Sequence, residues 1–368
     1  MRVVNLVDSV DGINFGIWNA ALNTSRLLSR EFGVETEIWT PSTNSSWDHS
    51  AYELSAVRML DSVGRQGCDA VIRTASISPH DTVIVSHGVW QFASRWGYHL
   101  AKRDFAWMSV PHGMLEPWPL QQKKFRKLVY RHLFEDRYLA KASVVRAVAS
   151  PEKANLHKLL GPRHYVELIP NGVDPPQFDV SDKPVQRTIL FMGRLHKKKC
   201  VTELVQAFVS LTAAERAGSR LLIVGPDHGE LEKIQQILNS SQEANIEVLG
   251  PIYGDEKAAL LREATFFALP SHSEGLPTSV LEAMSFGCIP IITEGCNIPE
   301  ATSANLGIVV KPSQDSIAAG VRTGLAVDEG ALRAKQLATS KFVRENYSIE
   351  VIARNLHSLF GQMLANQY

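Results

Sequence analysis

A chain of 368 residues, 45% hydrophobic and 21% charged, is longer than one hydrophobic core usually organises and has the composition of an ordinary globular protein. Its 38 basic residues balance 38 acidic ones, so the formal net charge of zero argues against a nucleic-acid-binding protein. No uncharged apolar run reaches the roughly 18 residues that a membrane-spanning helix needs.

The cysteines and the N-terminus indicate the compartment. Cys68, Cys200, Cys288 and Cys296 lack paired spacing, which predicts free thiols in a reducing environment, with a metal site or a disulfide as the lesser alternative. The first apolar run is broken by Asp8, as in a first β-strand rather than a secretion signal. We therefore expect a cytoplasmic protein of the size of an enzyme.

Short β-rich segments alternate with helical patterns along the first half of the chain. A helical pattern that ends at Gly33 lies between the first two strands. Strands separated by helices indicate parallel βαβ units. The strands are predicted at residues 2–8, 34–40, 81–88, 105–113 and 142–150.

A connector at 167–184, with two adjacent prolines and an Asn-Gly, predicts a domain boundary. The alternation then restarts, and a last helical segment at 348–367 closes the chain. Two doubly wound α/β domains are therefore predicted, with the ligand site in a cleft between them, at the carboxyl ends of the strands. The later strands are predicted at 187–193, 219–225, 245–250, 264–270 and 289–294.

Basic residues follow the first strand of the second half. In "FMGRLHKKKC" the strand ends at Gly193, and Arg194 and a lysine cluster come before the next helix. Arginine offers a bidentate fork and lysine a mobile charge, so this position suits a phosphate group. The alternative is that Lys197–Lys199 form a solvated turn.

Two glutamates, Glu274 and Glu282, flank a predicted helix start near Pro277 in "SHSEGLPTSVLEAM". The backbone N–H groups between them form an anion site at the positive end of the helix. The arrangement suggests two carboxylates on either side of a bound diphosphate. The alternatives are an ordinary loop charge for Glu274 and a surface pair with a lysine for Glu282.

Together, "VPHGMLEPW", "IPNGVD", "GRLHKKKC" and "PSHSEGLPTSVLEAMSFGCIPII" resemble the retaining glycosyltransferases of family four, which have the GT-B fold. The matches follow the family's order from about residue 80 to the C-terminus, and "VPHGMLEPW" resembles enzymes of bacterial surface polysaccharides. The resemblance implies an acceptor-binding Rossmann-like domain at 1–170 and a nucleotide-sugar-binding one at 171–348. It also implies a C-terminal helix, 349–368, that packs back on the first domain.

The resemblance assigns the catalytic and donor-binding roles residue by residue. Glu274 would bind hydroxyls of the donor hexose, Glu282 the ribose, and Arg194 and Lys199 the diphosphate, while His112 would lie beside the transferred sugar. The donor set is completed by residues that bring their backbone close to the phosphates. These are Gly16, Gly275, Leu276, Pro277 and Thr278.

The sequence departs from the family at two places. Cys200 stands where the family usually has glycine after the lysine, and the first strand–helix loop lacks the usual pair of adjacent glycines. Gly12 and Gly16 are the available substitutes. His87, in "SHGVW", is a further candidate for contact with the acceptor or donor.

The segment Gln121–Arg137 carries six Lys and Arg against two acidic residues, with apolar residues at helical spacing. A solvated helix that turns Phe125, Leu128, Val129 and Leu133 to the core is one reading. The other is peripheral docking on anionic lipid on the inner face of the membrane, or contact of Lys123 and Lys124 with a lipid-diphosphate acceptor.

The resemblance thus predicts hexosyl transfer, with retention, from a UDP- or GDP-linked sugar to a glycan or polyprenyl-diphosphate-linked saccharide in polysaccharide biosynthesis. No Asp-x-Asp stretch occurs, which agrees with metal-independent chemistry, and no cofactor beyond the donor is expected. A dinucleotide oxidoreductase is disfavoured because "DGINFG" does not fit G-x-G-x-x-G. A non-catalytic nucleotide-sugar-binding partner protein and a GT-B epimerase remain as alternatives.

Overall fold

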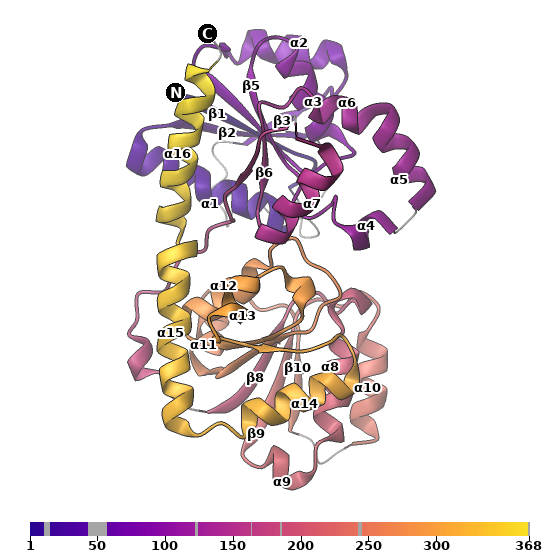
Figure 1. Cartoon of the computed structure of the whole chain (residues 1–368), viewed down its shortest axis with the longest axis vertical. Helices are drawn as coiled ribbons and strands as arrows, with labels where there is room; N and C mark the ends of the chain where they lie inside the picture. The colour runs from indigo at the N-terminus through magenta and orange to yellow at the C-terminus, as the bar shows by residue number, and fades with distance from the viewer. Residues whose placement is uncertain are drawn as a thin grey trace. The chain divides into compact units, whose positions relative to one another are not determined.

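The computed structural model describes residues 1–10, 15–42, 57–121, 124–162, 164–184, 186–241 and 245–366. The chain divides into two compact units (Figure 1). Unit 1 consists of Met1–Gly172 with Ile349–Tyr368, and unit 2 is Val173–Ser348. Each unit is described below by itself.

Unit 1 is built on a seven-stranded sheet in the order β3-β2-β1-β4-β5-β6-β7, in which every pair of neighbours is parallel. The strand order reverses between β1 and β4, which pair over their whole length from Arg2↔Thr82 to Val7↔His87. The strands are β1 Arg2–Val7, β2 Glu35–Pro41, β3 Val57–Leu60, β4 Thr82–His87, β5 Ala106–Val110, β6 Val144–Ala147 and β7 Val166–Leu168.

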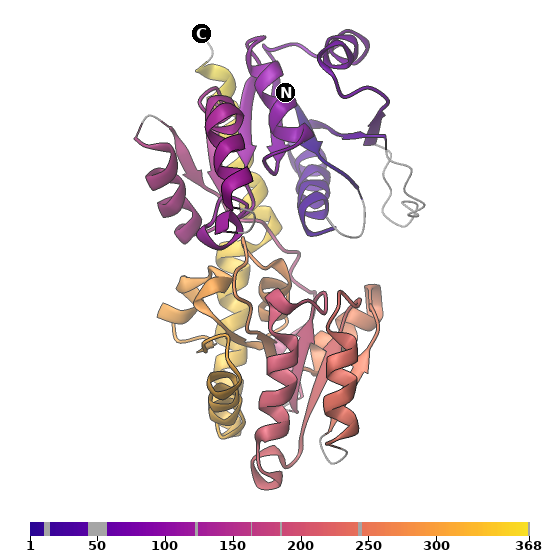
Figure 2. The ribbon, with the colours of Figure 1, turned by 90° about the vertical axis from the view of Figure 1, so that its right-hand side faces the viewer.

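Helices cover both faces of this sheet (Figures 1 and 2). The C-terminal helix α16 lies beside α1, where the rings of Phe32 and His357 stack with centroids 4.5 Å apart. The helices of the unit are α1 Phe15–Phe32, α2 Arg65–Thr74, α3 Phe92–Ala101, α4 Pro117–Gln121, α5 Lys124–Tyr130, the π-helical turn η2 Arg131–Glu135, α6 Asp136–Leu139, α7 Ser150–Leu160 and α16 Ile349–Ala365.

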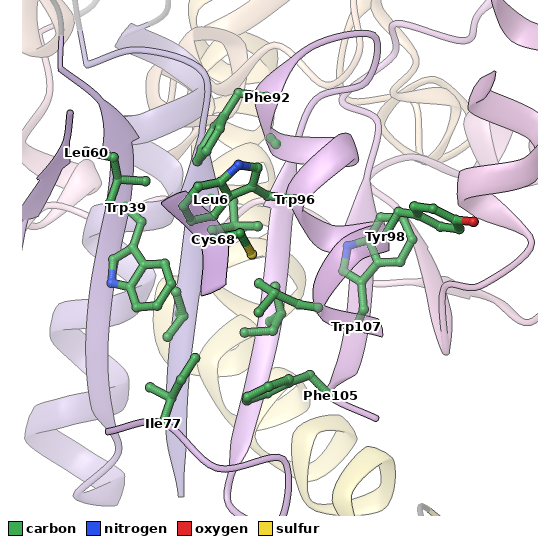
Figure 3. Packing of buried hydrophobic residues seen from close by; sticks show 14 of the residues in the cluster. Leu6, Trp39, Leu60, Cys68, Ile77, Phe92, Trp96, Tyr98, Phe105 and Trp107 are labelled. Carbon is green, nitrogen blue, oxygen red and sulfur yellow. The ribbon is translucent and has the colours of Figure 1, made fainter. Parts of the chain in front are cut away.

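The alternation of β1 divides the interior of unit 1 into two layers. Val4 and Leu6 point into a cluster under α2 and α3, whereas Asn5, between them, faces α1. The cluster holds three fully buried tryptophans, and each of them donates its indole N–H to a polar atom (Figure 3). Its indoles are therefore packed and hydrogen-bonded at once.

Unit 2 repeats the topology with a six-stranded parallel sheet in the order β10-β9-β8-β11-β12-β13, so the order reverses between β8 and β11. The strands are β8 Arg187–Met192, β9 Ser219–Val224, β10 Ile246–Leu249, β11 Phe266–Leu269, β12 Ile289–Ile292 and β13 Ile308–Val309. The α-helices are α8 Val201–Ser210, α9 Ala213–Arg216, α10 Leu231–Asn239, α11 Gly254–Glu263, α12 Thr278–Ser285, α13 Pro299–Ser303, α14 Gln314–Leu325 and α15 Glu329–Tyr347, and 3₁₀ turns lie at η3 Val180–Asp182, η4 Lys197–Lys199 and η5 Glu294–Cys296.

The predicted α/β class with two doubly wound domains is confirmed. The short strands β3, β7 and β13 were not predicted, and β7 overlaps the start of the expected connector. The four cysteines are buried free thiols. None of the helices in the described ranges is long and apolar enough to cross a membrane.

Of the two readings of the basic segment, the one that turns its apolar residues to the core is wrong. Phe125, Leu128, Val129 and Leu133 are all exposed, and α5 has no buried residue. The four residues are therefore not covered by the part of unit 1 that the structure describes.

Packing against Trp107 supplies a test of the unit 1 core. A Cβ added to Gly97 of α3 would lie 2.3 Å from the Trp107 ring, so Gly97→Ala should destabilise the protein by about 1–3 kcal/mol through overpacking. Gly361→Ala, at an exposed site of α16 with nothing near its Cβ, should instead stabilise by about 0.4–1 kcal/mol. Urea unfolding measures both, and equal effects of the two substitutions would contradict the packing described.

Candidate functional site

Two loops of unit 2 leave the carboxyl ends of β8 and β11, where the strand order reverses, and are tied to each other. The N–H of His272 donates to the carbonyl oxygen of Lys198 at 2.9 Å, and the hydroxyl oxygen of Ser271 lies 3.0 Å from the same carbonyl oxygen. In doubly wound sheets this reversal is where ligands bind. The loops therefore place their side chains at the position that the topology favours for a site.

An ion pair joins the two loops. Nζ of Lys199 lies 2.6 Å from Oε1 of Glu274, with the side chains 16% and 11% exposed, and the Ser271 hydroxyl donates to the same oxygen. Burial opposes ionisation of Glu274, but the Lys199 and Lys198 ammonium groups and these hydrogen bonds outweigh it and lower its pKa. Oε2 of Glu274 has no partner among the described residues, so a charged oxygen is left for a ligand.

The backbone of Glu274 is fixed as firmly as its side chain. Its N–H donates to the carbonyl of Gly295 at 2.7 Å, and the Asn297 amide donates to the carbonyls of Glu274 and Gly275 at 2.8 and 3.1 Å. Gly295 permits this approach, because a Cβ there would lie 2.5 Å from the carbonyl oxygen of His272. The carboxylate is thus held in place without a ligand.

The N-terminus of α12 is open. No side chain caps the helix, and in the part of the chain that the structure describes the N–H groups of Gly275, Leu276 and Thr278 donate no backbone or side-chain hydrogen bond. Unpaired N–H groups and the positive end of the helix dipole both attract anions. The helix starts one residue after Pro277, as the sequence predicts.

Arg194 and Glu282 are the remaining charged residues of the predicted donor set. The side chain of Arg194 is exposed and makes no hydrogen bond or ion pair with the described residues. Glu282, in the second turn of α12, pairs with Lys257 of α11 at 2.6 Å. Glu282 therefore forms the surface pair with a lysine that the sequence allowed as an alternative.

Cys200 occupies a backbone conformation that favours glycine. Its φ of 52° is in the left-handed region, where a side chain is strained and glycine is not. Its thiol is fully buried, and burial raises its pKa to about 12, so the sulfur is not a nucleophile. A strained side chain therefore stands at the end of the turn that positions Lys199.

In unit 1 the predicted histidines come together. His112, with a φ of 52° directly after β5, stacks on His87 at the end of β4, with ring centroids 5.2 Å apart. Burial, and to a lesser extent the nearby Arg146 guanidinium, lowers the pKa of His112 to about 3. Both rings are neutral at physiological pH, since burial also lowers the pKa of His87 well below its usual value.

The other predicted residues of unit 1 are less constrained. Gly16 is exposed in the first turn of α1, and a Cβ there would meet nothing within 4 Å, so the fold of unit 1 does not itself require glycine. Lys124 is exposed at the start of α5. Gly12 and Lys123 lie outside the described residues.

Sequence reasoning missed the partners of the charged residues. Ser271 lies three residues before Glu274 in the same loop, so its proximity could have been predicted. Lys257 and Asn297 come from other elements, and only the folded sheet brings them to the glutamates. Within the described ranges, no group of three His, Cys, Asp or Glu side chains is arranged to hold a metal ion.

The left-handed conformation of Cys200 predicts that alanine and glycine variants at this position reverse their usual order of stability. Alanine is usually more stabilising than glycine, but a left-handed φ costs alanine about 1–2 kcal/mol. Cys200→Gly should therefore be more stable than Cys200→Ala by about 1 kcal/mol in denaturant titrations. An alanine variant as stable as the glycine variant would show that residue 200 is not held in this conformation.

Two family models match consecutive parts of the chain. Residues 16–177 match the model described as Glycosyltransferase Family 4, and residues 175–340 match the model described as Glycosyl transferases group 1. Among curated proteins, a GDP-mannose:cellobiosyl-diphosphopolyprenol alpha-mannosyltransferase of Komagataeibacter xylinus is 28% identical over 208 residues. The alignment covers 53% of this chain and 51% of the relative, so the chain spans about half the length of that protein.

Solved structures with the same fold align over nearly the whole chain. Sucrose-phosphate synthase from Thermosynechococcus elongatus superposes with a TM-score of 0.78 at 18% identity, over 99% of each chain. Anabaena HepE in complex with UDP and glucose gives 0.75 at 15% identity, over 98% of this chain and 100% of HepE. At these identities the superpositions establish the fold alone.

Proposed function

Because the chain belongs to the glycosyltransferases of family 4 and has the GT-B fold, we propose that it transfers a hexosyl unit, with retention, from a UDP- or GDP-linked sugar. The acceptor in this proposal is a glycan or a lipid-linked saccharide in polysaccharide biosynthesis. The observation that carries it is the Lys199–Glu274 ion pair beside the open N-terminus of α12 at the strand reversal of unit 2.

The diphosphate of the donor takes the anion site. Arg194, which has no partner in the described ranges, supplies a guanidinium fork, and the unpaired N–H groups of Gly275, Leu276 and Thr278 supply further donors. Lys199, held 2.6 Å from Glu274, adds a positioned charge. Negative charge grows on the leaving diphosphate in the transition state, so donors fixed beforehand accelerate its departure.

The two glutamates bind the two ends of the donor, the hexose and the ribose. The unpartnered Oε2 of Glu274 accepts from hydroxyls of the hexose, and its lowered pKa keeps it ionised for this task. Glu282 accepts from the ribose hydroxyls, for which Lys257 must share or release the carboxylate. A charged acceptor that is already oriented loses little entropy when the sugar binds.

Transfer breaks the bond from the anomeric carbon to the diphosphate and forms a bond from that carbon to the acceptor oxygen on the same face. The proton of the acceptor hydroxyl passes to an oxygen of the leaving phosphate, and the nucleoside diphosphate departs. Arg194, Lys199 and the helix N-terminus carry the positive charge that stabilises this leaving group, so no metal ion is required in the proposed mechanism.

A named relative indicates the first donor and acceptor to test. The Komagataeibacter xylinus protein is described as using GDP-mannose and a cellobiosyl-diphosphopolyprenol. We include GDP-mannose and a saccharide linked through a diphosphate to a polyprenol among the proposed substrates. A thermal-shift panel of UDP- and GDP-sugars ranks the donors, since a ligand at one hundred times its dissociation constant adds about 2.7 kcal/mol of stability.

Substitutions at the site separate its roles. Arg194→Ala and Glu274→Ala should each lower transfer by about a hundredfold or more while circular dichroism shows a folded protein, because each removes a charge from the reacting centre. Glu282→Ala should mainly raise the donor KM. Lys341→Ala, an exposed lysine of α15, is the matched control and should be unaffected. Normal turnover of Arg194→Ala or Glu274→Ala would rule out the site.

We also propose that unit 1 docks on an anionic membrane surface, where a polyprenyl-linked acceptor would lie. The described part of the chain has eleven exposed large hydrophobic side chains, and five of them lie in α5 and η2, from Phe125 to Phe134. This α5–η2 surface includes Phe125 at 78% and Leu133 at 61% exposure, with Lys124 and Arg126 beside them. Apolar side chains bordered by basic ones suit the headgroup region of anionic lipid.

Vesicle flotation tests the docking. The Phe125→Ser, Leu133→Ser double variant should lose about tenfold or more of its binding to anionic vesicles, since burying each side chain is worth about 1.5–3 kcal/mol. Its matched control is Leu337→Ser, at a 42% exposed position of α15 in unit 2. Wild-type protein that ignores anionic vesicles would refute the membrane proposal, and self-association lost in the double variant would assign the surface to a second copy.

A further inference from the structure

A row of four polar side chains crosses the interior of unit 1 and ends at His112. The Ser25 hydroxyl of α1 lies 3.1 Å from Nδ2 of Asn5, and Oδ1 of Asn5 lies 3.0 Å from Nε2 of His87. Nδ1 of His87 in turn lies 3.0 Å from Nε2 of His112. Ser25, Asn5 and His87 are all buried, so each hydrogen bond fixes the next without competition from bulk water.

The direction of the row is set at Asn5. Its Nδ2 lies 3.4 Å from the backbone carbonyl of Glu37, and a carbonyl oxygen only accepts. The amide nitrogen of Asn5 therefore faces Glu37 and Ser25, and its oxygen faces His87. Since that oxygen also only accepts, Nε2 of His87 carries a proton.

The proton positions then follow ring by ring. A neutral His87 with its proton on Nε2 has an unprotonated Nδ1, which accepts from Nε2 of His112. A neutral His112 with its proton on Nε2 has a lone pair on Nδ1. That nitrogen makes no hydrogen bond with any residue in the described ranges, so it is left for a ligand.

Burial, and after it the charge of a neighbouring guanidinium, keeps both rings neutral. Arg146 of β6 is the nearby cation and disfavours imidazolium in either ring, while its guanidinium is held by the carbonyls of Ile169 and Pro170. Glu152 of α7 does not reach the rings. Its carboxylate accepts instead from the N–H groups of Gly113 at 2.6 Å and Val148 at 2.7 Å, which fixes the backbone next to His112.

We propose that Asn5 and His87 are positioning residues that hold His112 as a hydrogen-bond acceptor at Nδ1, directed at a hydroxyl group of the sugar substrate. An unprotonated nitrogen accepts from a hydroxyl and repels a phosphate oxygen, so this position reads the sugar and not the diphosphate. The ligand rests on the proposed glycosyl transfer, whereas the proton arrangement does not.

The arrangement of protons is measured by ¹⁵N-histidine NMR of the whole chain, with His112 assigned by His112→Gln. In the wild type, Nδ1 of His112 should be unprotonated and Nε2 protonated at every pH from 5 to 8. Asn5→Leu removes the acceptor for His87, so both rings should switch tautomer and the proton of His112 should move to Nδ1. A wild-type ring with its proton on Nδ1, or one that titrates between pH 5 and 8, would overturn the proposal.

Asn5→Asp distinguishes positioning from a merely structural role. A carboxylate in place of the amide oxygen still accepts from Nε2 of His87 but stabilises imidazolium, so the pKa values of the histidine pair should rise. The acid limb of kcat/KM should then move to higher pH, with full activity regained as the pH increases. Ser25→Ala, which leaves the Asn5–His87 bond intact, is the control and should keep the wild-type profile.

The two experiments fail separately. If Asn5→Leu switches the tautomer yet kcat/KM stays within about twofold, the row of hydrogen bonds exists but His112 does not bind the sugar, because a lost hydrogen bond should cost about tenfold in kcat/KM. If the enzyme shows no transfer with any donor while the wild-type tautomer is as described, the proposed function fails and the row of hydrogen bonds stands. If the pH profile of Asn5→Asp is the same as that of the wild type and of the Ser25→Ala control, the positioning role is excluded.

Discussion

The reversal of strand order between β8 and β11 is the constraint on which the candidate site depends. Two parallel strands lie side by side there, but the chain leaves them in opposite directions, so the loops after Met192 and Leu269 diverge around one point of the sheet edge. The turn with Lys199 comes from one loop and Glu274 from the other, and they meet in a 2.6 Å ion pair. α12 begins beside that pair with its N–H groups unpaired in the described chain, so the fold creates an anion site before any ligand arrives.

The candidate binding groups of the two units differ in charge. Unit 2 gathers charge: cations, unpaired N–H groups and an ionised Glu274 lie on its two tied loops, and we propose that they bind a diphosphate and the hydroxyls next to it. Unit 1 removes charge from its predicted histidines, since His87 is buried, His112 is half-buried, and both are neutral and joined by a hydrogen bond. Positive groups stabilise a leaving group that gains negative charge, and a neutral hydrogen-bond acceptor suits an uncharged sugar. Each arrangement is built from contacts inside its own unit.

The sequence predicted what local pattern determines. The helix start near Pro277 and the two parallel sheets follow from helix signals and periodicity, and they are confirmed. The two-residue strand β13 carries too little pattern to find. The pairing of Glu282 with Lys257 depends on long-range packing, which spacing along the chain does not encode. The exposure of Phe125 did not follow from the sequence, because amphipathic spacing shows that a helix has an apolar side but not what covers it.

Hydrogen–deuterium exchange of the full chain, with and without GDP or UDP, locates the bound diphosphate without requiring the acceptor. A nucleoside diphosphate should slow exchange in peptides covering Gly193–Cys200 and Ser271–Glu282, and Arg194→Ala should weaken the effect. Binding that protects other segments while leaving the start of α12 unchanged would rule out the proposed diphosphate site.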